Sequence, residues 1–223
     1  MGTWVRAVLF DLDGTLLDTA PDMAAALNAL LAEENRAALP YEEVRPFVSH
    51  GSSRLVRLGF PEVGPDRLTD LQKRYLDIYG GALSAHTQLF AGMDEVLARL
   101  HESGIPCGIV TNKPAALTNP LLEQLGLTSR FACVVSGDSV SERKPHPMPM
   151  LHAARLAGVA PIDCLYLGDA ERDIRAAHAA SMKALVATYG YLEPDEDWQA
   201  WGGDGFIRES ADLLTWIERS ART

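Results

Sequence analysis

Five short apolar segments recur along the 223-residue chain, separated mostly by stretches in which apolar residues follow helical spacing. They lie at residues 5–10, 106–111, 132–135, 164–168 and 184–187. Strands that alternate with helices imply a parallel sheet with right-handed crossover connections. We therefore predict an α/β fold, with a Rossmann-like parallel sheet core flanked by helices.

One long interval breaks this alternation, because no strand-like segment occurs between about residues 18 and 86. Apolar residues there follow helical spacing. Residues 18–21 include a proline suited to the first turn of a helix, and two adjacent glycines stand at positions 80–81. We predict an inserted all-helical cap domain at residues 18–86 and a core made of residues 1–17 and 87–223. The alternative is a helical subdomain that never moves.

Charge and hydropathy exclude several partners. Thirty acidic and twenty basic residues give a formal net charge of −10, and basic residues form no cluster. Nucleic-acid backbones are bound by clustered Lys and Arg, so we expect no nucleic-acid partner. No segment approaches the ~18 apolar residues of a membrane span, and no signal peptide is evident. We expect a cytoplasmic monomer or homodimer without a membrane partner.

The chain contains three cysteines, Cys107, Cys133 and Cys164, without the spacing of a metal or redox motif. Each stands at the edge of an apolar segment. We predict buried, reduced thiols that act as small hydrophobic side chains.

The first apolar segment ends in Asp11-Leu12-Asp13-Gly14-Thr15. Side chains two residues apart on an extended chain point to the same side, so Asp11 and Asp13 project together beyond the strand. Two adjacent anions repel unless a cation lies between them. This pattern predicts a site for Mg2+ and a phosphate group, and the alternative is a polar strand end with a glycine turn.

Two further segments supply donors for a phosphate group. Thr111, Asn112 and Lys113 end the second strand, where a hydroxyl and backbone N–H groups can bind phosphoryl oxygens, although Thr-Asn can also be a helix N-cap. Lys144 precedes a proline-restricted turn, and its ammonium beside Asp11 would keep that carboxylate ionised. We expect both segments to lie at the phosphate site.

The fourth segment, Leu167-Gly168-Asp169, ends another apolar strand and is followed by Asp173 one helical turn later. Carboxylates from two strand ends suit Mg2+, which binds few carboxylates directly and keeps several waters. We predict Asp169 as a direct ligand and Asp173 as a residue that orients the water on Asp169, or Lys144. Glu171 and Arg172 are expected to face solvent.

The motifs D-x-D-G-T, V-T-N-K, K-P-H-P and G-D-x-x-x-D occur here in the order found in the haloacid dehalogenase superfamily, which the chain resembles over nearly its whole length. The resemblance implies Asp11 as nucleophile and Asp13 as general acid/base. It implies Thr111 and Lys144 as partners of the phosphate and the nucleophile. It also implies Asp11, the Asp13 carbonyl and Asp169 as ligands of Mg2+.

Within this superfamily the chain resembles the phosphoglycolate phosphatase-like group at residues 110–114 and 188–191. It also resembles N-acetylmuramate 6-phosphate phosphatases at residues 86–93 and 189–194. Both resemblances imply a Mg2+-dependent phosphomonoesterase that forms an aspartyl-phosphate and takes a small phosphorylated carboxylate or sugar acid. N-acetylmuramate 6-phosphate is the first expectation. The alternatives are 2-phosphoglycolate and the chemistry of a sugar-phosphate mutase.

A loop at residues 48–54 is the best candidate in the insertion for contacting substrate. Its glycine opens a predicted helix whose free N–H groups could bind an anionic group, and Arg54 could bind a carboxylate. The alternative is an ordinary Ser-capped helix with Arg54 in solvent. The predicted substrate-binding residues are Ser49, His50, Gly51 and Arg54 in this loop, with Gly14, Thr15, Asn112 and Lys113 in the core.

Overall fold

The computed structural model describes residues 4–220. At its centre is a six-stranded sheet in the order β5-β4-β1-β6-β7-β8, in which every neighbouring pair is parallel. Its strands are β1 (Ala7–Phe10), β4 (Cys107–Val110), β5 (Cys133–Val135), β6 (Cys164–Gly168), β7 (Lys183–Ala187) and β8 (Gly205–Ile207). The predicted α/β fold class is therefore confirmed.

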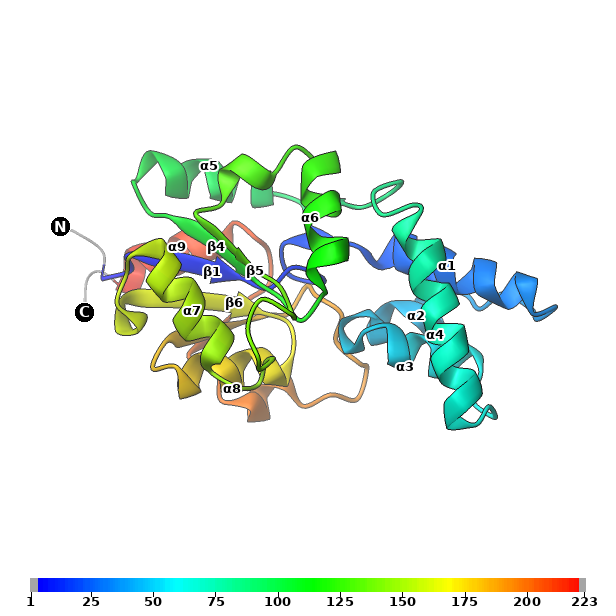
Figure 1. Cartoon of the computed structure of the whole chain (residues 1–223). Coiled ribbons are helices and arrows are strands. Elements are labelled where there is room, and N and C mark those ends of the chain that lie inside the picture. Colours follow the sequence, from blue (N-terminus) through cyan, green and yellow to red (C-terminus); the bar gives the residue numbers. More distant parts are fainter. Residues whose placement is uncertain (1–3, 221–223) are drawn as a thin grey trace.

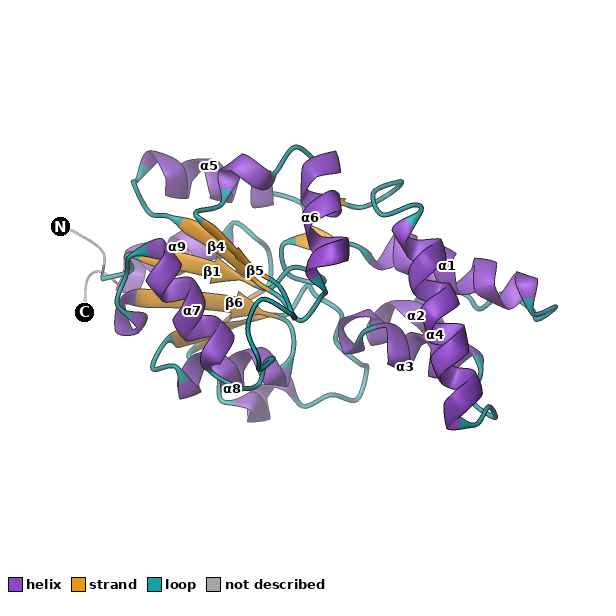
Figure 2. Cartoon of the chain, in the orientation of Figure 1, coloured by secondary structure: helices purple, strands orange, loops and turns teal. Residues whose placement is uncertain are grey.

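Helices cover both faces of this sheet (Figures 1 and 2). Successive side chains of β1 alternate between two buried clusters: Val8 and Phe10 belong to one, and Ala7 and Leu9 to the other. The first cluster takes in side chains of α5 (Met93–Glu102), α6 (Ala115–Gln124) and α9 (Asp212–Ser220), and the second those of α7 (Met148–Ala157) and α8 (Glu171–Ala179). Burial on both faces explains why the strands are almost wholly apolar.

The strand order reverses at β1. From β1 the chain builds β4 and β5 on one side, then crosses to β6 and β7 on the other. Parallel sheets bind ligands beyond the carboxyl ends of their strands, at such a reversal point. Asp11, Thr111 and Asp169 directly follow β1, β4 and β6, and so share that edge.

A group of helices lies beyond this same edge of the sheet (Figure 1). It comprises α1 (Ala20–Glu33), α2 (Tyr41–Val44), the 3-10 helix η1 (Arg45–His50), α3 (Ser52–Gly59) and α4 (Pro65–Gly80). Leu27, Leu30, Leu71 and Tyr75 are among its buried residues. The absence of a strand across this interval agrees with the helical spacing in the sequence.

Three short strands lie outside the predicted ones. Short strands β2 (Leu17–Asp18) and β3 (Gln88–Leu89) pair antiparallel and bring the two linkers of the helical insertion side by side. The edge strand β8 follows η4 (Trp198–Trp201), and the remaining 3-10 turns are η2 (Thr128–Arg130) and η3 (Pro161–Asp163). Within residues 4–220 no helix is both long enough and apolar enough to cross a membrane.

All three cysteines are buried and free, as the sequence predicts. Burial raises the pKa of Cys107 to about 12 and the pKa of both Cys133 and Cys164 to about 11. A thiol reacts through its thiolate, so these thiols are almost entirely in the unreactive form near neutral pH.

We therefore expect the folded protein to resist a thiol-specific disulfide reagent and the denatured protein to release three equivalents of its chromophore. Any slow reaction of the folded protein with the reagent should proceed at the rate at which the protein unfolds. Rapid reaction of one equivalent without denaturant would contradict this account of the cysteines.

Candidate active site

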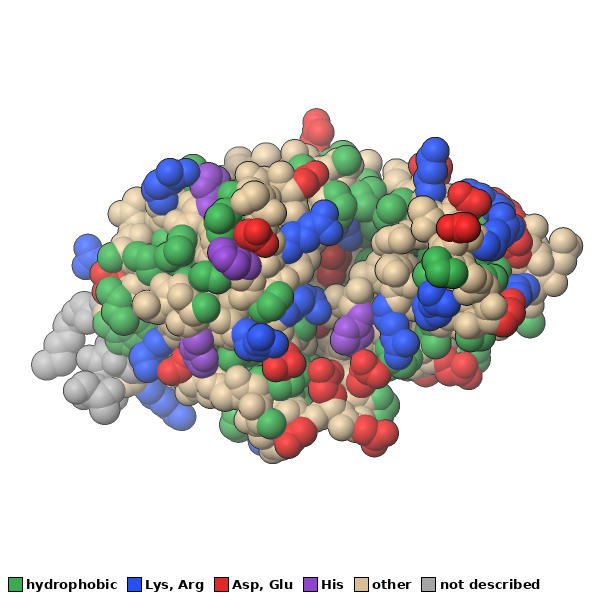
Figure 3. Space-filling view, turned by 60° about the horizontal axis from the view of Figure 1, so that its bottom comes forward, with side chains coloured by type: hydrophobic (Ala, Val, Ile, Leu, Met, Phe, Trp, Pro, Cys, Tyr) green, Lys and Arg blue, Asp and Glu red, His purple; other side chains and the backbone are tan. Residues whose placement is uncertain are grey.

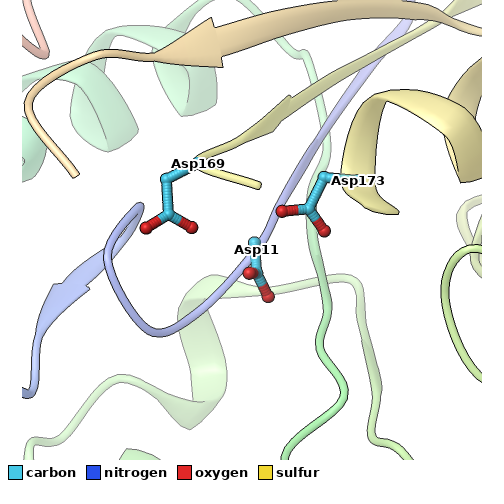
Figure 4. A group of neighbouring side chains, drawn as sticks. All are labelled: Asp11, Asp169 and Asp173. Atoms are coloured by element: carbon cyan, nitrogen blue, oxygen red, sulfur yellow. The ribbon is translucent and has the colours of Figure 1, made fainter. Parts of the chain in front are cut away.

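Three buried carboxylates meet at the reversal point of the sheet. Asp11 follows β1, Asp169 follows β6 and Asp173 lies in the first turn of α8 (Figure 4). One carboxylate oxygen from each of the three residues lies within 4.8 Å of one from each of the other two. Burial, followed by repulsion from neighbouring carboxylates that include Asp11, raises the pKa of Asp169. Burial likewise raises the pKa of Asp173, against the opposing pull of Lys144.

Lys144 is the cation inside this cluster. Its Nζ lies 2.8 Å from Asp11 Oδ1 and 2.7 Å from Asp173 Oδ1. It also donates to the Val110 carbonyl and the Tyr166 hydroxyl, both at 2.8 Å. Four acceptors around one ammonium fix its position.

One lysine does not balance three carboxylates. Despite its ionic contact with Lys144, the buried Asp11 Oδ1 receives no hydrogen bond from the described residues. A buried acceptor without a donor is costly unless a further positive group satisfies it. The all-oxygen donor set and its excess negative charge fit a hard divalent cation such as Mg2+.

The Asp13 carboxylate points to different partners. Its Oδ1 accepts hydrogen bonds from Thr19 Oγ1 at 2.7 Å and from Lys113 Nζ at 2.8 Å. Lys113 also donates to the hydroxyl of Tyr79, from α4, at 2.8 Å. Burial alone would lower the pKa of Lys113, but Asp13 and then Tyr79 outweigh it, so this pKa is raised and the ammonium stays charged.

The residues that directly follow β4 bind the backbone of two lysines of the site, Lys113 and Lys144. Thr111 Oγ1 accepts from the backbone N–H of Lys113 at 3.1 Å, but α6 begins at Ala115 with Pro114 at its N-cap, so Thr111 is not the N-cap of that helix. Both ends of the Asn112 amide bind the backbone of Lys144, each at 3.0 Å. Asn112 thus fixes the backbone of Lys144 in this structure. Its predicted contact with substrate stays a prediction.

Two glycines allow the chain to approach Asp169. Gly14 has a φ of +84°, and a Cβ there would stand 2.0 Å from Asp169 Oδ2. A Cβ at Gly190 would stand 2.4 Å from Asp169 Cβ. Thr15 Oγ1 reaches Asp169 Oδ1 at 3.5 Å. Packing at Gly14 and Thr15 therefore shapes the acidic cluster itself.

The residues predicted to contact substrate in the loop at residues 48–54 fall into two groups by location. Ser49, His50 and Gly51 line a cavity that also exposes Asp11 and Asp13. Arg54 is exposed, lies outside that lining and places its guanidinium 4.8 Å from the centre of the Phe47 ring. The placement matches the alternative in which Arg54 faces solvent.

Arg172 corrects a sequence expectation. We expected it to face solvent, but it lines the cavity and donates to the Ser49 carbonyl at 2.8 Å. Burial alone would lower the pKa of Arg172, but Asp173 and the nearby Asp11 outweigh it and raise this pKa. Helical spacing alone could not reveal this, because the insertion packs over a position that would otherwise be exposed. Glu171 is exposed, as expected.

The cavity has a volume of about 530 Å3 and opens between the core and the insertion. Figure 3 shows a hollow between these two parts, with basic and histidine side chains beside it. Its size lies within the ~300–1,000 Å3 of pockets that hold small organic ligands. The lining includes the acidic Asp11 and Asp13, the basic Lys113, Arg143 and Arg172, the polar Ser49, Gln72 and Thr111, and the apolar Met23, Val48 and Leu76.

Residues 8–187 match the family model described as haloacid dehalogenase-like hydrolase. Among curated proteins, the chain is 44% identical over 208 residues to a phosphoglycolate phosphatase from Xanthomonas campestris, covering 93% of this chain and 94% of that one. It is 36% identical over 217 residues to an N-acetylmuramic acid 6-phosphate phosphatase from Pseudomonas putida, covering 96% of each. A crystal structure of a predicted phosphoglycolate phosphatase from Haemophilus somnus superposes with a TM-score of 0.86 at 28% identity, covering 97% and 99% of the two chains.

Proposed function

The chain belongs to the haloacid dehalogenase-like hydrolases, and on that premise we propose that it is a Mg2+-dependent phosphatase acting on phosphate monoesters. The observation that carries this proposal is the Asp11 carboxylate, which lies at the cavity in ionic contact with Lys144 and in one buried cluster with Asp169 and Asp173. Relatives named phosphatases match the chain over nearly its whole length, which supports the same activity.

The chemistry follows from the positions of these residues. The Asp11 carboxylate, 2.8 Å from the Lys144 ammonium, attacks the phosphorus atom while the bond to the leaving oxygen breaks. Asp13 gives that oxygen a proton, then accepts one from the water that cleaves the aspartyl-phosphate. Asp11, Asp169 and the Asp13 carbonyl would hold Mg2+, which supplies positive charge against the phosphoryl oxygens.

Asp13 can perform this task because only one of its oxygens is held. Thr19 and Lys113 both bind Oδ1, and no hydrogen bond from the described residues reaches Oδ2. A general acid/base must offer an oxygen within hydrogen-bond reach of the proton it moves. We assign that role to Oδ2.

N-acetylmuramate 6-phosphate is the substrate we propose first. A cavity of about 530 Å3 has room for an acetylated sugar acid, and the Pseudomonas putida relative carries that substrate in its name. The alternative is 2-phosphoglycolate, which is supported by the higher identity to the Xanthomonas campestris relative. We further propose that residues 18–86 act as a cap that closes over either substrate.

The test is Mg2+-dependent phosphate release from both esters, compared as kcat/KM. N-acetylglucosamine 6-phosphate, which lacks the lactyl carboxylate, serves as the matched control for a sugar acid. We expect a preference of about a hundredfold, near 2.7 kcal/mol, for the muramate ester over 2-phosphoglycolate. The reverse preference would favour the alternative, and isomerised sugar phosphate without free phosphate would indicate a mutase.

A further inference from the structure

One residue of the helical insertion is bound directly to the acidic cluster. Ser49, in η1, donates from its hydroxyl to Asp169 Oδ2 at 2.7 Å. The hydroxyl oxygen of Ser49 also lies 3.5 Å from the Asp13 carbonyl oxygen. Its own carbonyl accepts from Arg172 at 2.8 Å. The Ser49 hydroxyl is therefore held by a residue of the proposed metal site, and the Ser49 carbonyl by a residue that lines the cavity.

The two oxygens of Asp169 differ in what they can still bind. Oδ2 accepts from Ser49 and, at 2.9 Å, from the backbone N–H of Tyr191. Among the described residues, Oδ1 receives only the 3.5 Å contact from Thr15. Gly14 also approaches Oδ2 closely, since a Cβ at that position would stand 2.0 Å from it. Ser49 thus holds one oxygen of Asp169 and leaves the other for a metal ion.

The same 3-10 helix is fastened to the core on either side of Ser49. Arg45 donates to the Tyr189 carbonyl at 3.1 Å, and its guanidinium lies 4.9 Å from the centre of the Tyr191 ring. His50 Nε2 lies 2.9 Å from Glu193 Oε1. These partners belong to the loop after β7 that also supplies the Tyr191 N–H to Asp169. The docking of η1 and the orientation of Asp169 therefore both depend on this loop.

We propose that Ser49 is a positioning residue that couples closure of the cap to metal binding. This inference rests on the proposed function. With the cap docked, the Ser49 hydroxyl fixes Asp169 with Oδ1 free, so the closed form binds Mg2+ more tightly than the open form. Because coupling between two equilibria is reciprocal, Mg2+ in turn favours docking of η1.

Two measurements on the full chain test the coupling, both without substrate. The first is the Kd for Mg2+ by calorimetry, and the second is hydrogen exchange of residues 45–50 with and without Mg2+. Ser49→Ala should raise the Kd about tenfold or more, the usual effect of losing a partner of a metal ligand. It should also abolish the protection that Mg2+ gives to η1.

Ser53→Ala is the matched control, because Ser53 lines the same cavity without a contact to Asp169. Ser53→Ala should leave the Kd for Mg2+ and the protection of η1 as in the wild type. Ser49→Thr, which keeps a hydroxyl, should restore most of the coupling. An unchanged Kd and unchanged protection in Ser49→Ala would overturn the inference alone. Failure of the wild type to bind Mg2+ would overturn the proposed metal dependence, and the inference with it.

Discussion

Asp11→Asn should abolish phosphate release while leaving the fold intact. The amide matches the carboxylate in volume but is a far weaker nucleophile, so the covalent step is lost. We expect kcat/KM to fall on the order of 10^4-fold or more, the scale seen when a nucleophile is removed. The measurement is phosphate release under saturating Mg2+, with circular dichroism to verify the fold.

The control for this variant is Asp70→Asn, which makes the same change at an exposed position of α4. It should retain wild-type activity. Because Asp11 is one of three buried carboxylates that repel each other, Asp11→Asn should also leave the metal-free protein at least as resistant to unfolding as the wild type. Normal turnover by Asp11→Asn would rule out Asp11 as nucleophile.

Lys144→Met should remove both activity and much of the stability. The change leaves Asp11 and Asp173 buried without the ammonium that lies within 2.8 Å of each. Leaving buried charges without an ionic partner lowers the free energy of unfolding by about 3–5 kcal/mol. Denaturant unfolding in the presence of EDTA at about pH 7 measures the loss directly.

The pH dependence of this variant provides a second check. Burial raises the pKa of Asp173 in the folded state, and loss of Lys144 removes the group that opposes this rise. The folded state then binds more protons than the unfolded state as pH falls toward that raised pKa, so the variant regains stability on acidification.

Lys183→Met is the control, since Lys183 forms an exposed ion pair with Asp204. It should cost at most about 1 kcal/mol. Equal losses in the two variants would contradict the role given to Lys144.

The sequence predicts the sheet well because its strands are buried on both faces and are therefore almost uninterrupted apolar runs. The predicted segment at residues 164–168 coincides with β6, and the other four agree with observed strands to within two residues. The β2–β3 pair escapes detection because each strand spans only two residues, which is too short to show periodicity. The edge strand β8 is as short as β5, but only one of its three residues is buried, so it forms no apolar segment.

In the site, too, the sequence predicts some residues and misses others. Asp11, Thr111, Lys144 and Asp169 converge because they stand at strand ends or in a restricted turn, which the order of motifs reveals. Contacts between the core and the insertion are invisible to local patterns, as Arg172 illustrates. Whether it faces solvent depends on η1, more than a hundred residues earlier in the chain.

The stereochemical course at phosphorus tests the central claim most directly. A phosphorothioate ester made chiral at phosphorus with two oxygen isotopes would be hydrolysed by the wild-type protein with Mg2+ in water of the third isotope, and the configuration of the released inorganic thiophosphate determined. Attack by Asp11 followed by attack of water inverts the phosphorus twice, so we predict overall retention. Overall inversion would mean that water attacks the substrate directly, and would contradict the aspartyl-phosphate on Asp11.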